Sequence, residues 1–351
     1  MLLAQTGIAT GLLGMALNNP VNDLELIAGF ALLVAFGSAT QDITIDAYRI
    51  EAVDKQYQGA MAASYVFGYR VALLVAGAGV FYLAEFYSWS FAYICMSMLM
   101  SIGIISTLVI REPEHVIDQT SQELEHRLER MAGLREQSSM DARASAWFVD
   151  AVVSPFVEFF QRFGKSALII LLLIGCYRIS DITMGVMANP FYLDLGFSKA
   201  EIASVTKIFG FFMTIAGAAL GGLCVVRFGI LKPLLTGAIL IVITNLLFVI
   251  LAGHEPDLVK LAVVVSADNL SGGFATSAFI AYLSSLTSKS YTATQYALFS
   301  SIMTLPAKIL GGYSGVIVEH IGYANFFLYA GLIGIPAIIL VLVLMPRQTT
   351  E

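Results

Sequence analysis

Nine ionisable side chains lie inside long apolar runs of this 351-residue sequence, at positions where a lipid bilayer would give them no water. They are Asp42, Asp46, Arg49, Arg70, Arg178, Asp181, Lys207, Asp268 and Lys308. A charged side chain at the centre of a membrane helix costs about 2.5–3.5 kcal/mol on insertion scales, so such residues face a bundle interior or a wet cavity and usually pair. We therefore expect these side chains to mark a polar path through the protein.

The spacing of several of these charges fits pairing on a helix. Asp42, Asp46 and Arg49 are four and three residues apart and share one helical stripe, and Arg178 and Asp181 are one turn apart. For Asp46 and Arg49, a structural ion pair near the end of a span is as good an interpretation as a functional role. For the whole set, opposite charges spread over six spans are hard to explain by anchoring, and they favour a solute transporter.

The acids in this set are candidates for proton coupling, because a carboxyl group in a water-poor interior can bind and release a proton near neutral pH. These acids are Asp42, Asp46, Asp181 and Asp268. The bases Arg178, Lys207 and Lys308 are candidates to bind an anionic substrate group or to hold those acids charged. Spacing alone does not choose between the two roles.

The composition predicts that lipid surrounds most of the chain. Hydrophobic residues make up 58% of the sequence, charged residues only 13%, and the mean hydropathy is +0.81. A soluble domain needs more charge to cover its surface, and apolar runs of about 20 residues span a bilayer as helices. We therefore expect an all-α integral membrane protein.

No other class of function competes with transport in this sequence. It contains no P-loop and no GxSxG motif, and its histidines lack paired zinc-site spacing, so we expect no catalytic residue, metal or cofactor. No basic stripe or stacking motif indicates nucleic acid. The three cysteines are far apart and lie in or beside apolar runs, which is typical of packing residues.

Ten transmembrane helices are predicted, in two groups separated by one long polar segment. Four spans belong to an incomplete N-terminal bundle (1–110) and six to a C-terminal bundle (165–351). Within the connecting segment 111–164, the spacing predicts a surface helix at 123–136 and an aromatic-rich amphipathic helix at 147–163, lying in the interface plane. The predicted spans are about 1–18, 25–48, 59–84, 89–110, 166–190, 200–224, 232–252, 259–286, 293–318 and 325–345.

The distribution of Lys and Arg predicts the orientation. If segment 111–164 is cytoplasmic, thirteen Lys and Arg residues in loops and at span ends, Arg49 included, lie on that side and only Lys199 and Lys260 lie on the other. This is a strong positive-inside bias. With ten spans, both termini are then expected to be cytoplasmic.

Several motifs resemble known transporter families. The run GLCVVRFGILK (222–232) resembles the cytoplasmic signature of the major facilitator superfamily, although Val226 and Ile230 replace its acidic and one of its basic positions. Closer matches are to the AmpG-type muropeptide permeases of that superfamily. They are SATQDITIDAYR (38–49), VSPF (153–156) with YRISD (177–181), DNLSGGFATSAF (268–279) and KSYTATQYAL (289–298).

This resemblance implies a major facilitator-type helical bundle in the bacterial inner membrane. It implies proton-driven import of anhydro-muropeptides, a sugar-peptide conjugate used in cell-wall recycling, by what we expect to be a monomer. The substrate carries carboxylates that buried bases could bind, and an aromatic ring such as Tyr177 could stack on a sugar. Matched motif positions add Gln41 and Asn269 to Arg49, Arg70, Tyr177, Arg178, Lys207 and Lys308 as candidates for substrate binding or charge pairing.

Two alternatives remain open at this point. The eukaryotic acetyl-CoA transporters share the fold and a related motif in the second span, so another cargo such as an acyl-CoA fits the same pattern. In addition, if 25–48 is the family's fourth helix, the first two helices are absent, which leaves a truncated or mis-assigned start. The chain could then be a remnant that does not transport.

Overall fold

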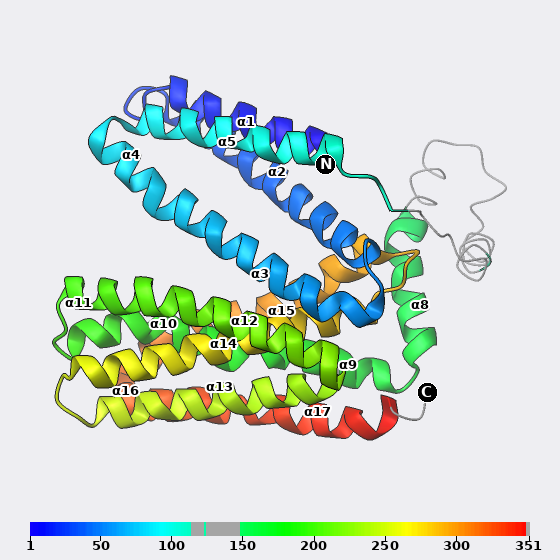
Figure 1. Ribbon diagram of the computed structural model, residues 1–351, viewed down its shortest axis with the longest axis vertical. Coiled ribbons are helices and arrows are strands. Elements are labelled where there is room, and N and C mark those ends of the chain that lie inside the picture. The colour runs from blue at the N-terminus through cyan, green and yellow to red at the C-terminus, as the bar shows by residue number, and fades with distance from the viewer. Residues whose placement is uncertain (114–122, 124–147, 349–351) are drawn as a thin grey trace. The chain divides into compact units, whose positions relative to one another are not determined.

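The computed structural model describes residues 1–113, 123 and 148–348, and its described part is built from helices without a strand (Figure 1). The predicted all-α class is confirmed. The predicted surface helix at 123–136 lies outside the described residues apart from residue 123, as does Trp147 at the start of the predicted amphipathic helix.

The chain divides into two compact units. The first contains Met1–Ala52 and the chain from Gly68 to the end of α5, and the second contains Val53–Phe67 and the chain from α8 to α17. Helix α3 (Gln58–Leu74) therefore contributes its first half to the second unit and its last turns to the first.

In the first unit, α1 packs against both α2 and α5. Two polar contacts connect α1 and α5: Gln5 donates to Thr107 Oγ1 at 3.0 Å, and the Ser97 hydroxyl donates to the carbonyl of Ala9 at 2.9 Å. The Ser88 hydroxyl caps the start of α5 by accepting from the Phe91 amide at 3.1 Å. The helices are α1 (Leu2–Leu17), α2 (Leu24–Glu51), α4 (Val80–Phe86) and α5 (Trp89–Val109).

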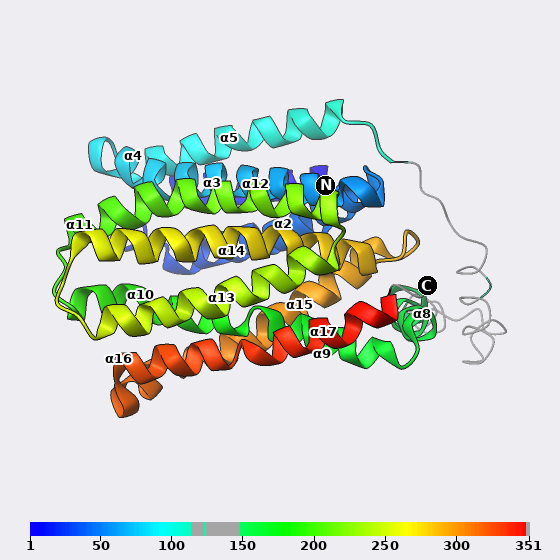
Figure 2. The ribbon, with the colours of Figure 1, turned by 60° about the horizontal axis from the view of Figure 1, so that its bottom comes forward.

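The second unit is a bundle in which α14 lies beside both α12 and α13 (Figures 1 and 2). Asp257 caps the start of α14 by accepting from the amides of Val259 and Lys260. Its helices are α8 (Ser154–Phe163), α9 (Ser166–Tyr177), α10 (Ile179–Asp194), α11 (Lys199–Ala203), α12 (Gly210–Phe228), α13 (Leu231–Ala252), α14 (Leu258–Leu286), α15 (Thr292–Gly312), α16 (Ser314–Leu332) and α17 (Ile335–Gln348).

Glycines let the backbones of α12 and α14 touch. A Cβ at Gly217 would lie 2.0 Å from the carbonyl oxygen of Leu270, and one at Gly273 would lie 2.2 Å from that of Thr214. A Cβ at Gly221 would likewise meet the α14 backbone, at 2.5 Å. In lipid, where the hydrophobic effect does not drive helices together, such small-residue contacts are a main source of helix association.

A turn at Gly322 separates the last two predicted spans. Gly322 has φ 74° and ψ 165°, a conformation that favours glycine, and it divides α16 into two helical parts. The α15 helix and the first part of α16 occupy the predicted ninth span, and the rest of α16 with α17 occupies the tenth.

Eight helical runs among the described residues are long and apolar enough to cross a membrane. The first predicted span forms the apolar helix α1, which has only 16 residues and is not among these eight. Helix α15, which forms most of the predicted ninth span, is not among the eight either, and the run Ser314–Pro346, which contains the turn at Gly322, covers the end of that span and the tenth. The chain is therefore a multi-pass membrane protein.

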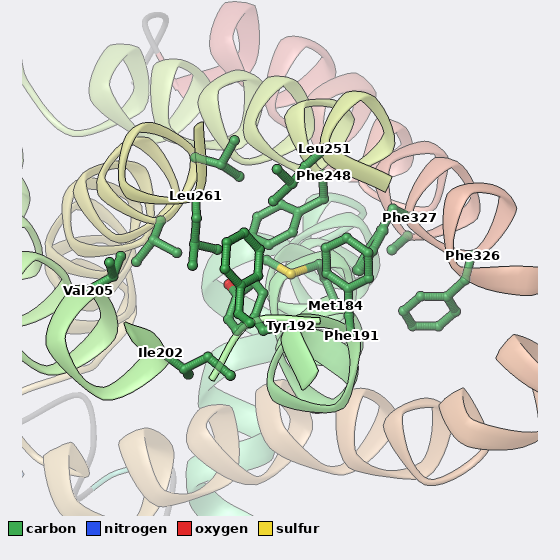
Figure 3. Close-up of a cluster of buried hydrophobic side chains, with 14 residues drawn as sticks. Met184, Phe191, Tyr192, Ile202, Val205, Phe248, Leu251, Leu261, Phe326 and Phe327 are labelled. Atoms are coloured by element: carbon green, nitrogen blue, oxygen red, sulfur yellow. The ribbon is translucent and has the colours of Figure 1, made fainter. Parts of the chain in front are cut away.

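Aromatic residues fill the core of the second unit at one end of α10, α13 and α16 (Figure 3). Phe191 packs edge-on against Phe327 at 4.8 Å between ring centroids, and Phe327 meets Phe248 at 5.2 Å. Tyr192 also stacks on Phe248, at 6.3 Å between ring centroids. This aromatic cluster forms an apolar wall inside the bundle, and charged side chains lie near it.

We predict that Gly217→Ala destabilises the second unit. The new methyl group would overlap the backbone of α14, and overpacking of this kind costs about 1–3 kcal/mol. The midpoint of thermal unfolding in detergent should fall, whereas Gly315→Ala, where a Cβ meets nothing within 4 Å, should leave it unchanged. Equal midpoints for both variants would contradict a tight α12–α14 contact.

Candidate functional site

The fifth predicted span consists of two helices that meet at Arg178. Helix α9 ends at Tyr177 and α10 begins at Ile179, and Arg178 itself has φ −98° and ψ −4°. Asp181 lies in the first turn of α10, where the positive end of the helix dipole stabilises a carboxylate. The break thus places a base and an acid together at the start of a helix.

Arg178 connects α10 to α14. Its guanidinium forms an ion pair with Asp181 at 2.8 Å and also donates to the Thr276 hydroxyl. The Thr276 hydroxyl in turn donates to the carbonyl of Gly272 on its own helix, at 2.7 Å. About a fifth of each side chain of the pair is exposed, 20% for Arg178 and 19% for Asp181, so water or a solute can reach it.

Asp268 belongs to the same site from the side of α14. Asp268, Gly272 and Thr276 are spaced by four residues and lie on one stripe of that helix. A Cβ at Gly272 would lie 3.8 Å from Asp181 Oδ1, so the Asp181 carboxylate lies against this stripe. Asp268 is close enough to interact electrostatically with both Asp181 and Arg178. The described charges of the site are therefore two carboxylates and one guanidinium.

The aromatic core borders this group of charges. Tyr192 is buried in the cluster of Figure 3 and is close enough to interact electrostatically with Asp268. An apolar wall lowers the local dielectric and so strengthens every charge interaction beside it. Asp268 thus lies between the apolar aromatic cluster and the Arg178–Asp181 ion pair.

Tyr177 does not lie where the sequence suggested. Its ring is only 2% exposed, stacks on Phe279 at 4.3 Å, and its hydroxyl donates to the carbonyl of Leu234 at 2.9 Å. Because the ring face and the hydroxyl are both occupied, the expectation that Tyr177 stacks on a sugar is wrong for this arrangement. It packs α9 against α13 and α14 next to Arg178.

Three further candidates have different surroundings. Asn269 fastens two helices, since its Oδ1 accepts from Thr214 at 3.0 Å and its Nδ2 donates to the carbonyl of Val265 at 2.8 Å. Lys308 on α15 is exposed and has no ion-pair partner among the described side chains. Lys207 lies in the π-helical turn Ser204–Phe209, and its side chain is outside the described ones.

The first unit carries the predicted stripe on α2. Arg49 is 3% exposed and forms an ion pair with Asp46 at 3.1 Å, while Asp42 interacts electrostatically with Asp46 and is itself exposed. The Oε1 atom of Gln41 is buried without a hydrogen-bond partner in the described part of the chain. Arg70 is partly exposed in the last turns of α3. The Asp46–Arg49 geometry fits the structural ion pair that the spacing allowed.

A polar group that the sequence reasoning did not single out joins α8 to the turn between α14 and α15. Arg162 forms an ion pair with Glu158 at 3.2 Å and donates to the backbone carbonyl of Leu286. Gln295 on α15 donates to Glu158 at 2.7 Å. The i,i+4 spacing of Glu158 and Arg162 was readable in the sequence, but no local pattern indicates Gln295 as their partner.

The comparisons with known proteins agree with this architecture. The family profile of the Major Facilitator Superfamily matches residues 1–311 and 170–351. The Anhydromuropeptide permease of Escherichia coli K12 is 32% identical over 353 residues, which is 100% of this chain and 66% of the permease. The protein named "Putative transporter AmpG 4" in Rickettsia conorii is 30% identical over 346 residues, or 98% of this chain and 78% of that protein.

Among solved structures, the proton:xylose symporter XylE is similar in fold, with a TM-score of 0.67 at 11% sequence identity, covering 96% of this chain and 78% of the symporter. This likeness shows the fold alone, whereas the curated relatives narrow the family. The chain therefore belongs to the major facilitator superfamily of membrane transporters and, within it, to the AmpG-type permeases.

Proposed function

We propose that this chain carries anhydro-muropeptides across the bacterial inner membrane into the cytoplasm, together with protons. The observation that carries the proposal is the group formed by Arg178, Asp181 and Asp268, together with the relationship to a named anhydromuropeptide permease. The bias of thirteen basic loop residues against two supports an orientation with segment 111–164 and both termini in the cytoplasm.

The described charges support proton coupling at this site. One guanidinium cannot neutralise two carboxylates, and an uncompensated charge beside the apolar aromatic cluster costs free energy. Binding one proton makes the described group neutral. Of the two acids, Asp181 has the ion pair and the helix dipole to stabilise its charge, so Asp268 is our candidate for the proton carrier.

The same group supports recognition of an acidic solute. A muropeptide carries carboxylates on its peptide, and a guanidinium binds a carboxylate through two parallel hydrogen bonds. In the structure Asp181 pairs with Arg178 through its Oδ2 atom, which lies 2.8 Å from Arg178 Nη2, while Nη1 of Arg178 donates to Thr276. A substrate carboxylate would therefore compete with Asp181 for the same guanidinium, and the displaced Asp181 would need compensation of its own. A proton that binds at the site would neutralise this unpaired negative charge. Binding of the substrate would then be coupled to binding of a proton.

We predict that Asp268→Asn uncouples transport from protons. In proteoliposomes, the variant should lose uptake against a gradient of labelled anhydro-muropeptide but keep exchange of internal for external substrate, because exchange moves no net proton. Asp257→Asn is the matched control on the same helix, since asparagine caps a helix as well as aspartate.

If the Asp268→Asn variant still accumulates labelled anhydro-muropeptide, and a protonophore abolishes that accumulation, Asp268 is not the proton carrier. Lys207→Gln in the same assay tests whether Lys207 is a second base of the site. If it is, its loss should also change the coupling of substrate uptake to protons.

We further predict that Arg178→Ala weakens binding of peptide-bearing substrate. A charge-assisted hydrogen bond contributes about 1.5–3 kcal/mol, so KM should rise about ten- to hundredfold for a muropeptide with free carboxylates. For the same muropeptide with its carboxylates converted to amides the change should be small. The double variant Arg178→Ala/Asp181→Asn removes the acid that the single variant leaves unpaired, and it should keep the raised KM. Equal effects on both substrates would argue against a carboxylate contact.

A panel of competing solutes separates the cargo classes. Unlabelled anhydro-muropeptide should suppress uptake of the labelled compound, whereas acetyl-CoA should not. Suppression by acetyl-CoA alone would favour the other cargo.

A further inference from the structure

Helix α8 lies at the end of the segment that connects the two predicted bundles. It ends at Phe163, and the following Gly164, whose φ is 49°, turns the chain into α9. On the inner side of α8, Phe159 is 2% exposed and packs against Phe299 of α15, with 5.2 Å between ring centroids. This apolar contact places α8 on the first turns of α15.

Gln295 lies one turn before Phe299 and is 1% exposed, and its amide is fully hydrogen-bonded. Its Nε2 donates to Glu158 at 2.7 Å and to the carbonyl of Pro155 at 2.9 Å. Its Oε1 accepts from the Ser288 amide at 2.8 Å and lies 3.5 Å from Arg162 Nη2. One buried side chain therefore binds both α8 and the turn between α14 and α15.

Arg162 completes the connection with a charge. It pairs with Glu158 through Nε and donates to the carbonyl of Leu286, which is the last residue of α14 and has no partner within that helix. A cation at this place also complements the negative end of the helix dipole. Burial lowers the pKa of Arg162, and the neighbouring Glu158 carboxylate opposes that shift.

We propose that Glu158, Arg162 and Gln295 form a latch that fastens α8 to the α14–α15 turn, so that α8 moves with α14 during transport. Helix α14 carries Asp268 and Thr276, and the latch binds its final carbonyl. A rearrangement of α14 at the charged site is then transmitted to α8 and to the connecting segment. The proposal does not depend on which solute is carried.

Hydrogen exchange tests the fastening directly. Gln295→Met and Arg162→Met remove the polar contacts while keeping side-chain length, and both should speed amide exchange in residues 154–163 by about tenfold or more, as expected for loss of hydrogen bonds to a charged group. Peptides from α13 should be unchanged. Gln161→Met is the matched control, because Gln161 lies on the same helix with its side chain exposed. Wild-type exchange rates in both latch variants would overturn the latch.

Transport kinetics test the coupling. Loosening α8 should lower kcat by about tenfold while KM changes less than twofold, since the latch does not contact the charged site. Faster exchange at α8 with an unchanged kcat would overturn the coupling. If Arg162→Met does not fold, Glu158→Gln removes the ion pair but keeps an acceptor for Gln295, and it should show both effects in smaller measure. The exchange result stands even if anhydro-muropeptide proves to be the wrong cargo.

Discussion

The backbone contact between α12 and α14 constrains the rest of the second unit. Gly217, Gly221 and Gly273 allow the two helices to approach until main-chain atoms touch, which fixes both the rotation and the register of α14. Because a helix is rigid over its length, that register determines two distant features at once. It directs the stripe of Asp268 and Thr276 toward α10, and it sets where the last carbonyl of α14 meets α8.

Charge compensation explains why this site is built from three helices. A single charge in the interior of a membrane protein is costly, and a pair is tolerable only with hydrogen bonds for its remaining atoms. Arg178, at the break between α9 and α10, meets this requirement. It forms an ion pair with Asp181 in the first turn of α10 and donates a hydrogen bond to Thr276 on α14. Asp268 lies close enough to both members of the pair to interact with them electrostatically. It is the acid that we propose as the proton carrier.

The sequence predicted the fold better than the contacts of individual side chains. Apolar runs of spanning length predicted the eight helical runs that are long and apolar enough to cross a membrane, and they placed a break between 318 and 325 where the structure has Gly322. The first and ninth predicted spans form helices that are not among these eight. The i,i+3 spacing predicted the pairs of Asp46 with Arg49 and Asp181 with Arg178. The sequence did not reveal that Tyr177 is enclosed by Phe279 and α13, because burial of a ring depends on residues a hundred positions away.

The contacts of Gln295 show why the remaining part could not be predicted. Helical periodicity identifies which residues share a face, but it does not identify the partner of that face across the chain. Gln295 is separated by more than a hundred residues from Glu158, and the motif in which it lies (289–298) does not indicate which residue it contacts. Only packing of Phe159 on Phe299 brings α8 near enough for the amide to bond. Local sequence therefore specified each helix, while long-range packing determined which polar groups could meet.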